Sequence, residues 1–254
     1  MKISLIQTSI KWLDVEKNQD AAKEWIIKSR DKGADLCIFS EMFTTGFCMD
    51  PSKCAQREES VEDWFGAMAD EYDIAIGGGV AIEQDGGTVN RFYIVEPNGR
   101  VSQYDKRHLF TFAGEQNYYT PGVERVVVEI KGVMILLLVC YDLRFPVWCR
   151  NTDNYDVMLC IANWPKSRRF VWDTLLRSRA IENVCYVGGV NIVGEDPSCV
   201  YSGGTAAINF RGEAISQVED DAHGIAIFDV DLEALQSFRA KFPALEDMDK
   251  FEIK

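Results

Sequence analysis

Apolar positions recur at helical spacing in one segment of this chain and in short continuous runs in many others. Within residues 60–72 they fall at i, i+3, i+4, i+7, i+8 and i+11, occupied by Val61, Trp64, Phe65, Met68, Ala69 and Tyr72. This spacing predicts an amphipathic helix that starts at Ser60, with Ser60 and Asp63 as a capping box. Three further helices are predicted, at residues 15–32, 168–182 and 232–241.

Short apolar runs between these segments predict strands. The runs cover residues 3–8, 36–39, 74–82, 91–96, 101–105, 125–130, 133–139, 157–161, 185–190, 205–210, 214–217 and 225–230. The segment 97–100 reads Pro-Asn-Gly-Arg and predicts a hairpin turn. The glycines at 77–79 lack the spacing of a phosphate-binding loop, so they indicate close packing of a strand instead.

Hairpins mixed with strand–helix–strand units predict an α/β fold in which helices cover the outer faces of mixed sheets. A four-layer α-β-β-α sandwich with two mixed sheets satisfies this order of elements, and so does a single mixed sheet. The pattern alone does not rank the two. The chain has 254 residues without a low-complexity linker or internal repeat, so we expect a single domain over residues 1–254.

The charge and composition of the chain limit the kinds of molecule that it is expected to bind. The formal net charge of −13 argues against nucleic acid or an anionic membrane surface, because both favour a basic patch. Residues 1–8 lack the apolar core and cleavage site of a signal peptide, and the run 133–139 is too short to cross a bilayer as a helix. Eight cysteines without a C-x-x-C pair, beside only two histidines, predict no metal site and reduced thiols in a cytoplasm.

Four polar residues come directly after strand-like runs: Glu41, Lys106, Cys140 and Asn163. Open α/β sheets place their chemistry at the carboxyl ends of strands, so Cys140 is a candidate nucleophile. A thiol nucleophile must be ionised, and it needs a proton carrier and a partner for the oxyanion. We expect the ammonium of Lys106 to lower the pKa of Cys140, and Glu41 to take the thiol proton and return it to departing ammonia.

Each of these residues also fits a purely structural role. A lone cysteine is more often part of a core than catalytic, and a glutamate after a strand can cap a helix. Lys106 can be a solvated hairpin end. His108 is the only histidine near this cluster, which leaves a Cys–His arrangement open.

Three separate segments resemble, in order, the signature of the nitrilase superfamily of carbon–nitrogen hydrolases. They are Phe39-Ser40-Glu41-Met42-Phe43, Tyr104-Asp105-Lys106-Arg107-His108-Leu109-Phe110 and Val139-Cys140-Tyr141-Asp142-Leu143-Arg144-Phe145-Pro146. The similarity continues through residues 162–165, 177–183 and 209–213. The resemblance implies the α-β-β-α sandwich, a homodimer, a Glu-Lys-Cys catalytic triad and no metal or organic cofactor.

The same resemblance implies roles for two more residues. Ala113-Gly114-Glu115-Gln116 matches a family element that places a second glutamate near the lysine. Glu115 is therefore expected to orient Lys106 or to position the substrate, although a loop acid can also be simply exposed. The backbone N–H of Tyr141 is expected to donate a hydrogen bond to the oxyanion.

Within the superfamily, Cys-Tyr-Asp after the strand and Ala-Asn-Trp-Pro at 162–165 are similar to the bacterial omega-amidase group. That group implies hydrolysis of the terminal amide of 2-oxoglutaramate or 2-oxosuccinamate. Such an acid needs a cationic partner, and Arg168 is the candidate, although it also fits a surface helix charge. The expected apolar walls are Phe43, Phe112, Tyr118 and Trp164. Another small amide, an N-carbamoyl compound, a nitrile and a non-catalytic interaction module remain alternatives.

Overall fold

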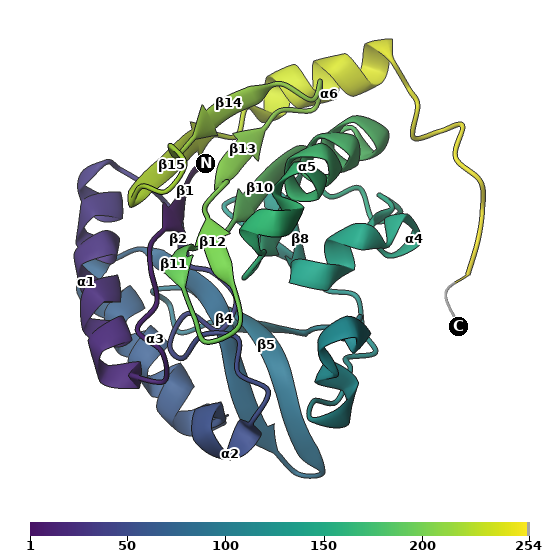
Figure 1. Cartoon of the computed structure of the whole chain (residues 1–254). Coiled ribbons are helices and arrows are strands. Elements are labelled where there is room, and N and C mark those ends of the chain that lie inside the picture. The colour runs from purple at the N-terminus through teal and green to yellow at the C-terminus, as the bar shows by residue number, and fades with distance from the viewer. Residues whose placement is uncertain (253–254) are drawn as a thin grey trace.

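Two mixed sheets face each other at the centre of the structure, a computed structural model that describes residues 1–252 (Figure 1). The first sheet has the order β15-β1-β2-β4-β5-β6, with β3 paired to β4. Its strands are β1 (Lys2–Gln7), β2 (Leu36–Ile38), β3 (Gln56–Arg57), β4 (Ala75–Gln84), β5 (Gly87–Val95), β6 (Val101–Asp105) and β15 (Gly224–Asp229). The central strands β1, β2 and β4 are parallel, and β15, β5 and β6 are antiparallel to their neighbours.

The second sheet repeats this plan in the order β14-β13-β10-β9-β8-β7. Its strands are β7 (Val127–Ile130), β8 (Val133–Val139), β9 (Val157–Ile161), β10 (Tyr186–Val190), β13 (Ala206–Ile208) and β14 (Ala214–Gln217). Here β8, β9 and β10 are parallel and the outer strands are antiparallel. A separate hairpin joins β11 (Val193–Glu195) to β12 (Val200–Ser202).

Helices cover the outer faces of both sheets, which makes four layers (Figure 1). On the first sheet lie α1 (Val15–Asp31) and α3 (Glu58–Tyr72), and α4 (Pro146–Cys149) and α5 (Arg169–Asn183) lie on the side of the second. The short α2 (Pro51–Cys54) precedes β3, and α6 (Leu232–Lys241) follows β15. No helix within the described residues has the length and apolar character needed to cross a bilayer.

Alternation along β2 shows how one strand serves two cores. Leu36 and Ile38 pack in the cluster that contains the facing side chains of the second sheet, whereas Cys37 and Phe39 pack with α1 and α3. A strand points successive side chains to opposite faces, so a run that is apolar throughout fits a sheet buried on both faces. The presence of two separate large sheets decides for the sandwich over a single mixed sheet.

The glycines of β4 permit the close packing that their sequence predicted. A Cβ at Gly77 would lie 2.9 Å from the carbonyl oxygen of Tyr93, and one at Gly79 would lie 2.9 Å from Ile161 in the opposite sheet. By contrast, the capping box predicted at Ser60 is wrong. Helix α3 begins at Glu58 after Arg57 and has no side-chain cap, and two acids in its first turn interact favourably with the helix dipole instead.

Candidate active site

The three predicted catalytic residues meet at the seam between the two sheets. Glu41 follows β2 and Lys106 follows β6, both in the first sheet, and Cys140 follows β8 in the second. Glu41 and Lys106 are fully buried, whereas Cys140 is half-buried and lines a cavity. Cys140 also has φ +46° at the start of the 3-10 turn Cys140–Arg144. A non-glycine residue rarely adopts this conformation, and functional sites are where it persists.

The ammonium of Lys106 sits between two carboxylates. Its Nζ lies 2.9 Å from Oε1 of Glu41 and 2.9 Å from Oε2 of Glu115. Asn90 on β5 donates from Nδ2 to both acids, at 2.8 Å to Glu41 and 3.2 Å to Glu115. The backbone N–H of Phe110 donates to Oε2 of Glu115 at 2.5 Å, whereas Asn90 donates to Oε1 of that residue. Glu115 therefore lies in direct contact with the Lys106 ammonium, which is the arrangement that a lysine-orienting role requires.

Glu41 is fixed by backbone and side-chain contacts from the opposite sheet. The N–H of Asn163, after β9, donates to Oε2 of Glu41 at 2.9 Å, and Nδ2 of Asn163 donates to the carbonyl of Glu41 at 3.0 Å. The turn also lies directly on β4, where a Cβ at Gly79 would come within 2.8 Å of the Glu41 Cα. The carboxylate is thus held before any substrate arrives.

These contacts set the protonation states. Burial lowers the pKa of Lys106, but attraction to Glu115 and Glu41 outweighs it, so the pKa lies above its ordinary value. Burial and then the charge of Glu41 raise the pKa of Glu115, although Lys106 opposes the rise. The carboxylates of Glu41 and Glu115 therefore share the single ammonium of Lys106.

Lys106 lowers the pKa of Cys140, as expected, but the net shift of that pKa is upward. Burial, followed by the charge of Glu41, raises the pKa of Cys140 well above its ordinary value, and the smaller effect of Lys106 does not reverse this. Burial is the largest cause, because it penalises the charged thiolate, and the charges of Glu41 and Glu115 add to it. At rest Cys140 is a thiol, and its proton must move to a base as the sulfur attacks.

A second buried network ties the cysteine turn to the lysine turn. The Asp142 carboxylate accepts hydrogen bonds from Tyr104 Oη at 2.7 Å, from the His108 N–H at 2.9 Å and from the Val139 N–H at 3.1 Å. His108 Nδ1 lies 2.8 Å from the same carboxylate, and its ring stacks on Phe145. Within the described residues the polar contacts of His108 go to Asp142 and none goes to Cys140, so this geometry does not support a Cys–His arrangement.

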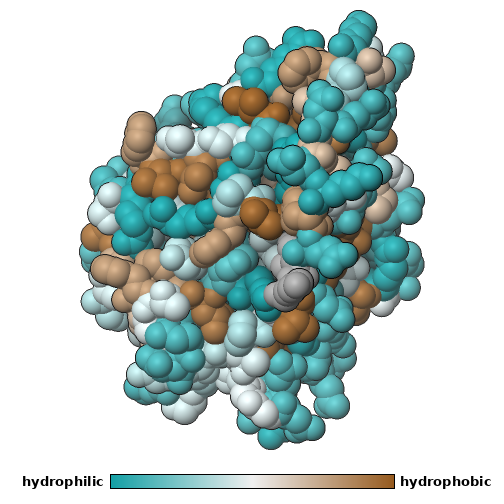
Figure 2. All heavy atoms as spheres, turned by 90° about the vertical axis from the view of Figure 1, so that its right-hand side faces the viewer, coloured by the Kyte–Doolittle hydropathy of each residue, from teal (hydrophilic) through white to brown (hydrophobic). Residues whose placement is uncertain are grey.

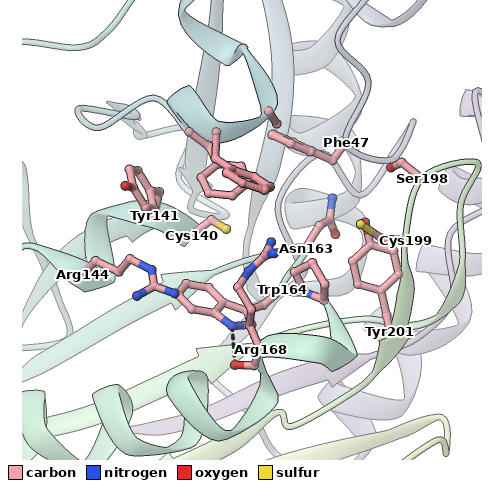
Figure 3. Close-up of a pocket in the computed structure, with 14 residues that line it drawn as sticks. Phe47, Cys140, Tyr141, Arg144, Asn163, Trp164, Arg168, Ser198, Cys199 and Tyr201 are labelled. Atoms are coloured by element: carbon pink, nitrogen blue, oxygen red, sulfur yellow. Dashed lines mark hydrogen bonds between the residues drawn. The ribbon is translucent and has the colours of Figure 1, made fainter.

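Cys140 opens into a cavity of about 260 Å³ (Figure 3). Its lining residues are Phe47, Phe110, Phe112, Ala113, Cys140, Tyr141, Arg144, Asn163, Trp164, Pro165, Arg168, Ser198, Cys199 and Tyr201. Four predicted binding residues, Phe112, Tyr141, Trp164 and Arg168, are among them. The cavity is mostly apolar with a few polar groups, as small-molecule sites usually are.

Two predicted wall residues do not reach this cavity. Phe43 is 4% exposed and stacks on Phe39 in the core beneath α3. Strand alternation would put Phe43 on the same face as Glu41, but the positive φ of Met42 between them reverses the direction of the chain. Tyr118 is 51% exposed and lies outside the cavity lining. Both assignments are corrected.

A thiol, a base that can carry its proton and a buried ammonium suit acyl transfer from an amide-like carbon. The sequence matches the carbon–nitrogen hydrolase family over residues 2–240. The chain belongs to this family. It is 44% identical to the omega-amidase YafV of Escherichia coli, over 100% of this chain and 98% of that protein.

Two further relatives of this carbon–nitrogen hydrolase agree with the assignment. It is 31% identical to the 2-oxoglutaramate amidase of Bacillus subtilis, over 98% of this chain and 97% of that protein. The solved structure of XC1258 from Xanthomonas campestris is a CN-hydrolase superfamily protein with an arsenic adduct in its active site. It superposes with a TM-score of 0.95 at 38% identity, and covers 100% of this chain and 99% of that one.

Several residues lie at the site of this carbon–nitrogen hydrolase that were not expected there from the sequence. Asn90 lies inside a strand, where nothing in the pattern marks it as part of a site. Asp142 and Arg144 belong to the segment that resembles the family, but only the structure shows that one is a buried acceptor and the other lines the cavity. The β11–β12 hairpin, which brings Ser198, Cys199 and Tyr201 to the cavity, was not predicted, because its strands are short and its loop is polar.

Proposed function

We propose that this carbon–nitrogen hydrolase is an omega-amidase. It hydrolyses the terminal amide of 2-oxoglutaramate or 2-oxosuccinamate to a 2-oxo dicarboxylate and ammonia. The observation that carries the proposal is the buried Lys106 between Glu41 and Glu115, set beside a thiol that opens into a small cavity with cationic groups. The names of the relatives from Escherichia coli and Bacillus subtilis support the same substrate class.

The first half-reaction forms a thioester. Cys140 Sγ attacks the amide carbon while its proton passes to Glu41. Lys106 and the Tyr141 N–H stabilise the oxyanion, an effect that is worth about 10²–10³ in kcat for a single donor. Glu41 then delivers the proton to the amide nitrogen, the carbon–nitrogen bond breaks and ammonia leaves.

The second half-reaction returns the enzyme to its starting state. Glu41 takes a proton from a water molecule, whose oxygen attacks the thioester carbon. The carbon–sulfur bond breaks, the acid is released, and Glu41 returns the proton to Cys140. The contacts from Asn163 and Asn90 keep the Glu41 carboxylate in one position through both halves. Glu115 acts through Lys106, so it is a positioning residue.

The cavity supplies the binding groups. Arg168 is the proposed partner of the substrate carboxylate, and Trp164 and Phe112 form apolar walls. The indole Nε1 of Trp164 donates to the Arg168 carbonyl at 2.9 Å, which fixes the backbone from which the guanidinium extends. No metal or organic cofactor takes part in this mechanism.

Three wider properties belong to the proposal. The chain acts as a single catalytic domain. It forms a homodimer, and exposed apolar side chains such as Val147 and Phe242 are available to pack at the dimer interface. Figure 2 shows separate hydrophobic patches in a largely hydrophilic surface on the face near α4. A reducing cytoplasm suits eight cysteines that are all free. Light scattering on the purified protein measures the oligomeric state directly.

Ammonia release across a panel of amides tests the function. We expect 2-oxoglutaramate to react with a higher kcat/KM than glutamine, asparagine, an N-carbamoyl amino acid or a simple nitrile. Cys140→Ala should abolish turnover, and Cys185→Ala, which removes another buried thiol, should keep it. A brief substrate pulse should leave an acyl adduct on Cys140 that mass spectrometry detects. Preference for another panel member would reject the omega-amidase assignment, and full activity in Cys140→Ala would reject the nucleophile.

A further inference from the structure

Two arginines line the catalytic cavity without an acidic partner. Within residues 1–252, no hydrogen bond or salt bridge engages the guanidinium of Arg144 or Arg168. They lie instead over aromatic rings, Arg144 5.1 Å from the centroid of Trp164 and Arg168 5.2 Å from that of Phe110. Seven of the 14 arginines pair with carboxylates, namely Arg30, Arg91, Arg100, Arg125, Arg169, Arg179 and Arg239. Among the seven described arginines that do not, Arg144 and Arg168 are the two that line the cavity.

The cavity wall is also free of acids. None of the described residues that line it is Asp or Glu. The nearby carboxylates, Glu41 and Glu115, are fully buried behind Cys140 and are already bonded to Lys106. Figure 3 shows Arg168 reaching into the cavity toward the sulfur of Cys140, and Arg144 approaching from the side of Tyr141. The electrostatic potential of the cavity is therefore set by two half-buried guanidinium groups.

We infer that Arg144 and Arg168 form a clamp that binds the acid end of the substrate, and that this clamp selects amides that carry a carboxylate and no ammonium. The inference rests on the proposed amidase function and adds Arg144 as a specificity-determining residue. Each guanidinium offers five N–H donors and no acceptor. A carboxylate next to a 2-oxo group presents only acceptors, so it can use donors from both arginines.

The same clamp rejects the corresponding amino acid. Glutamine has the same terminal amide as 2-oxoglutaramate, but an ammonium replaces the oxo group. In this cavity that ammonium meets two cations, and no lining carboxylate is available to pair with it. A buried charge without a partner is costly, so the 2-position decides between the two substrates.

Four five-carbon amides separate charge from shape: 2-oxoglutaramate, the monoamide of glutaric acid, glutamine and neutral pentanamide. We expect Arg144→Gln and Arg168→Gln each to lower kcat/KM for the two anionic amides by about 10- to 100-fold, the usual effect of losing a charged hydrogen bond. Pentanamide should stay within about threefold of its wild-type value, since it makes no charged bond. Glutamine should gain relative to 2-oxoglutaramate.

Lys166→Ala is the matched control, because Lys166 is an exposed cation on the same segment that pairs with Asp221 and lies outside the cavity. It should leave all four values unchanged if binding is local rather than long-range steering. An equal loss for pentanamide and the glutaric monoamide in Arg144→Gln would mean a structural role for Arg144. Unchanged values for the anionic amides would likewise overturn the clamp.

A binding measurement keeps this test independent of the proposed reaction. In the Cys140→Ala background, calorimetry should give a Kd for glutarate that rises about tenfold or more with Arg144→Gln and with Arg168→Gln. An unchanged Kd in Arg144→Gln overturns the clamp even if the wild type hydrolyses 2-oxoglutaramate. Conversely, failure of the wild type on 2-oxoglutaramate rejects the omega-amidase proposal, while a weakened Kd still supports the clamp.

Discussion

Asp142→Asn tests whether one buried carboxylate holds the nucleophile and lysine turns together. Asp142 is fully buried, and its two oxygens accept from Val139 before the cysteine and from Tyr104 and His108 on either side of Lys106. Asparagine keeps the shape of the side chain but turns one acceptor oxygen into a donor NH₂ group. The substitution therefore changes hydrogen bonding without leaving a cavity.

The size of the effect follows from counting donors. The least costly orientation points the new NH₂ group at His108, where Nδ1 can accept but the backbone N–H is left without an acceptor. One buried unpaired donor costs about 1–3 kcal/mol, and the bonds from Tyr104 and Val139 lose their charged acceptor at about 1 kcal/mol each. Partial relief from burying a charge offsets some of this, so we expect about 3 kcal/mol and a Tm lower by about 6–12 °C.

Activity should fall with stability. Since both turns lose their common anchor, we expect kcat to drop about 10- to 100-fold, the usual result of a displacement of about 1 Å among reacting groups. KM should change little, because the cavity lining does not include Asp142. Thermal unfolding and steady-state ammonia release on the same preparation measure both effects.

Asp153→Asn provides the control for this experiment. Asp153 pairs with Arg125 at the surface and its side chain is half-exposed, so its loss should cost less than about 1 kcal/mol and leave kcat unchanged. A Tm and a kcat for Asp142→Asn that both match those of Asp153→Asn would refute the anchoring argument. A fall in Tm with unchanged kcat would limit Asp142 to stability.

Three further predictions concern the groups around the site. Gly79→Ala should reduce kcat at least about tenfold, because its Cβ would lie 2.8 Å from the Glu41 Cα. The control Gly66→Ala, whose Cβ would have nothing within 4 Å, should retain activity, and equal kcat values for the two variants would contradict the prediction. Glu115→Gln should lower kcat about 10- to 100-fold by removing one of two carboxylates that position Lys106, and wild-type kcat would disprove that role. Burial raises the pKa of Cys37 from 9.0 to about 11. Above about pH 9 the unfolded chain therefore loses a proton that the native chain keeps, so the free energy of unfolding falls as pH rises. Urea unfolding at about pH 8 and about pH 11 should therefore show a loss of stability that is about 2 kcal/mol smaller in Cys37→Ala, and equal losses would refute it.

Strand ends were the most informative feature that could be predicted from the sequence. Apolar runs such as 133–139 have clear boundaries, so the sequence showed that Glu41, Lys106 and Cys140 each follow a strand. The resemblance of three segments, in order, to one family then grouped them, although their strands β2, β6 and β8 are not neighbours in one sheet. The periodicity of α3 likewise identified its buried face, since Val61, Phe65, Met68 and Ala69 are all buried.

What the sequence could not supply depends on packing between segments that are far apart in the chain. Asn90 joins the site only because β5 lies beside both acids, and an asparagine within a strand carries no local signal of that. Phe43 was misplaced because a single positive φ at Met42 reverses strand alternation, and no periodic pattern encodes a single dihedral angle. The net rise in the pKa of Cys140 also depends on packing, since burial and the charge of Glu41 outweigh the lowering by Lys106.

The charge arrangement connects the resting thiol to the choice of substrate. Burial, and then the charge of Glu41, raises the pKa of Cys140 and keeps the thiol protonated. Behind the thiol two carboxylates surround one ammonium, which makes this side of the site unfavourable for an anion. An anionic amide can then bind productively only if its acid end is held away from Glu41 and Glu115. Arg144 and Arg168 provide cations at the cavity wall, so an acid held there directs the neutral amide end toward the sulfur. The separation of buried acids from cavity arginines therefore orients the substrate as well as binding it.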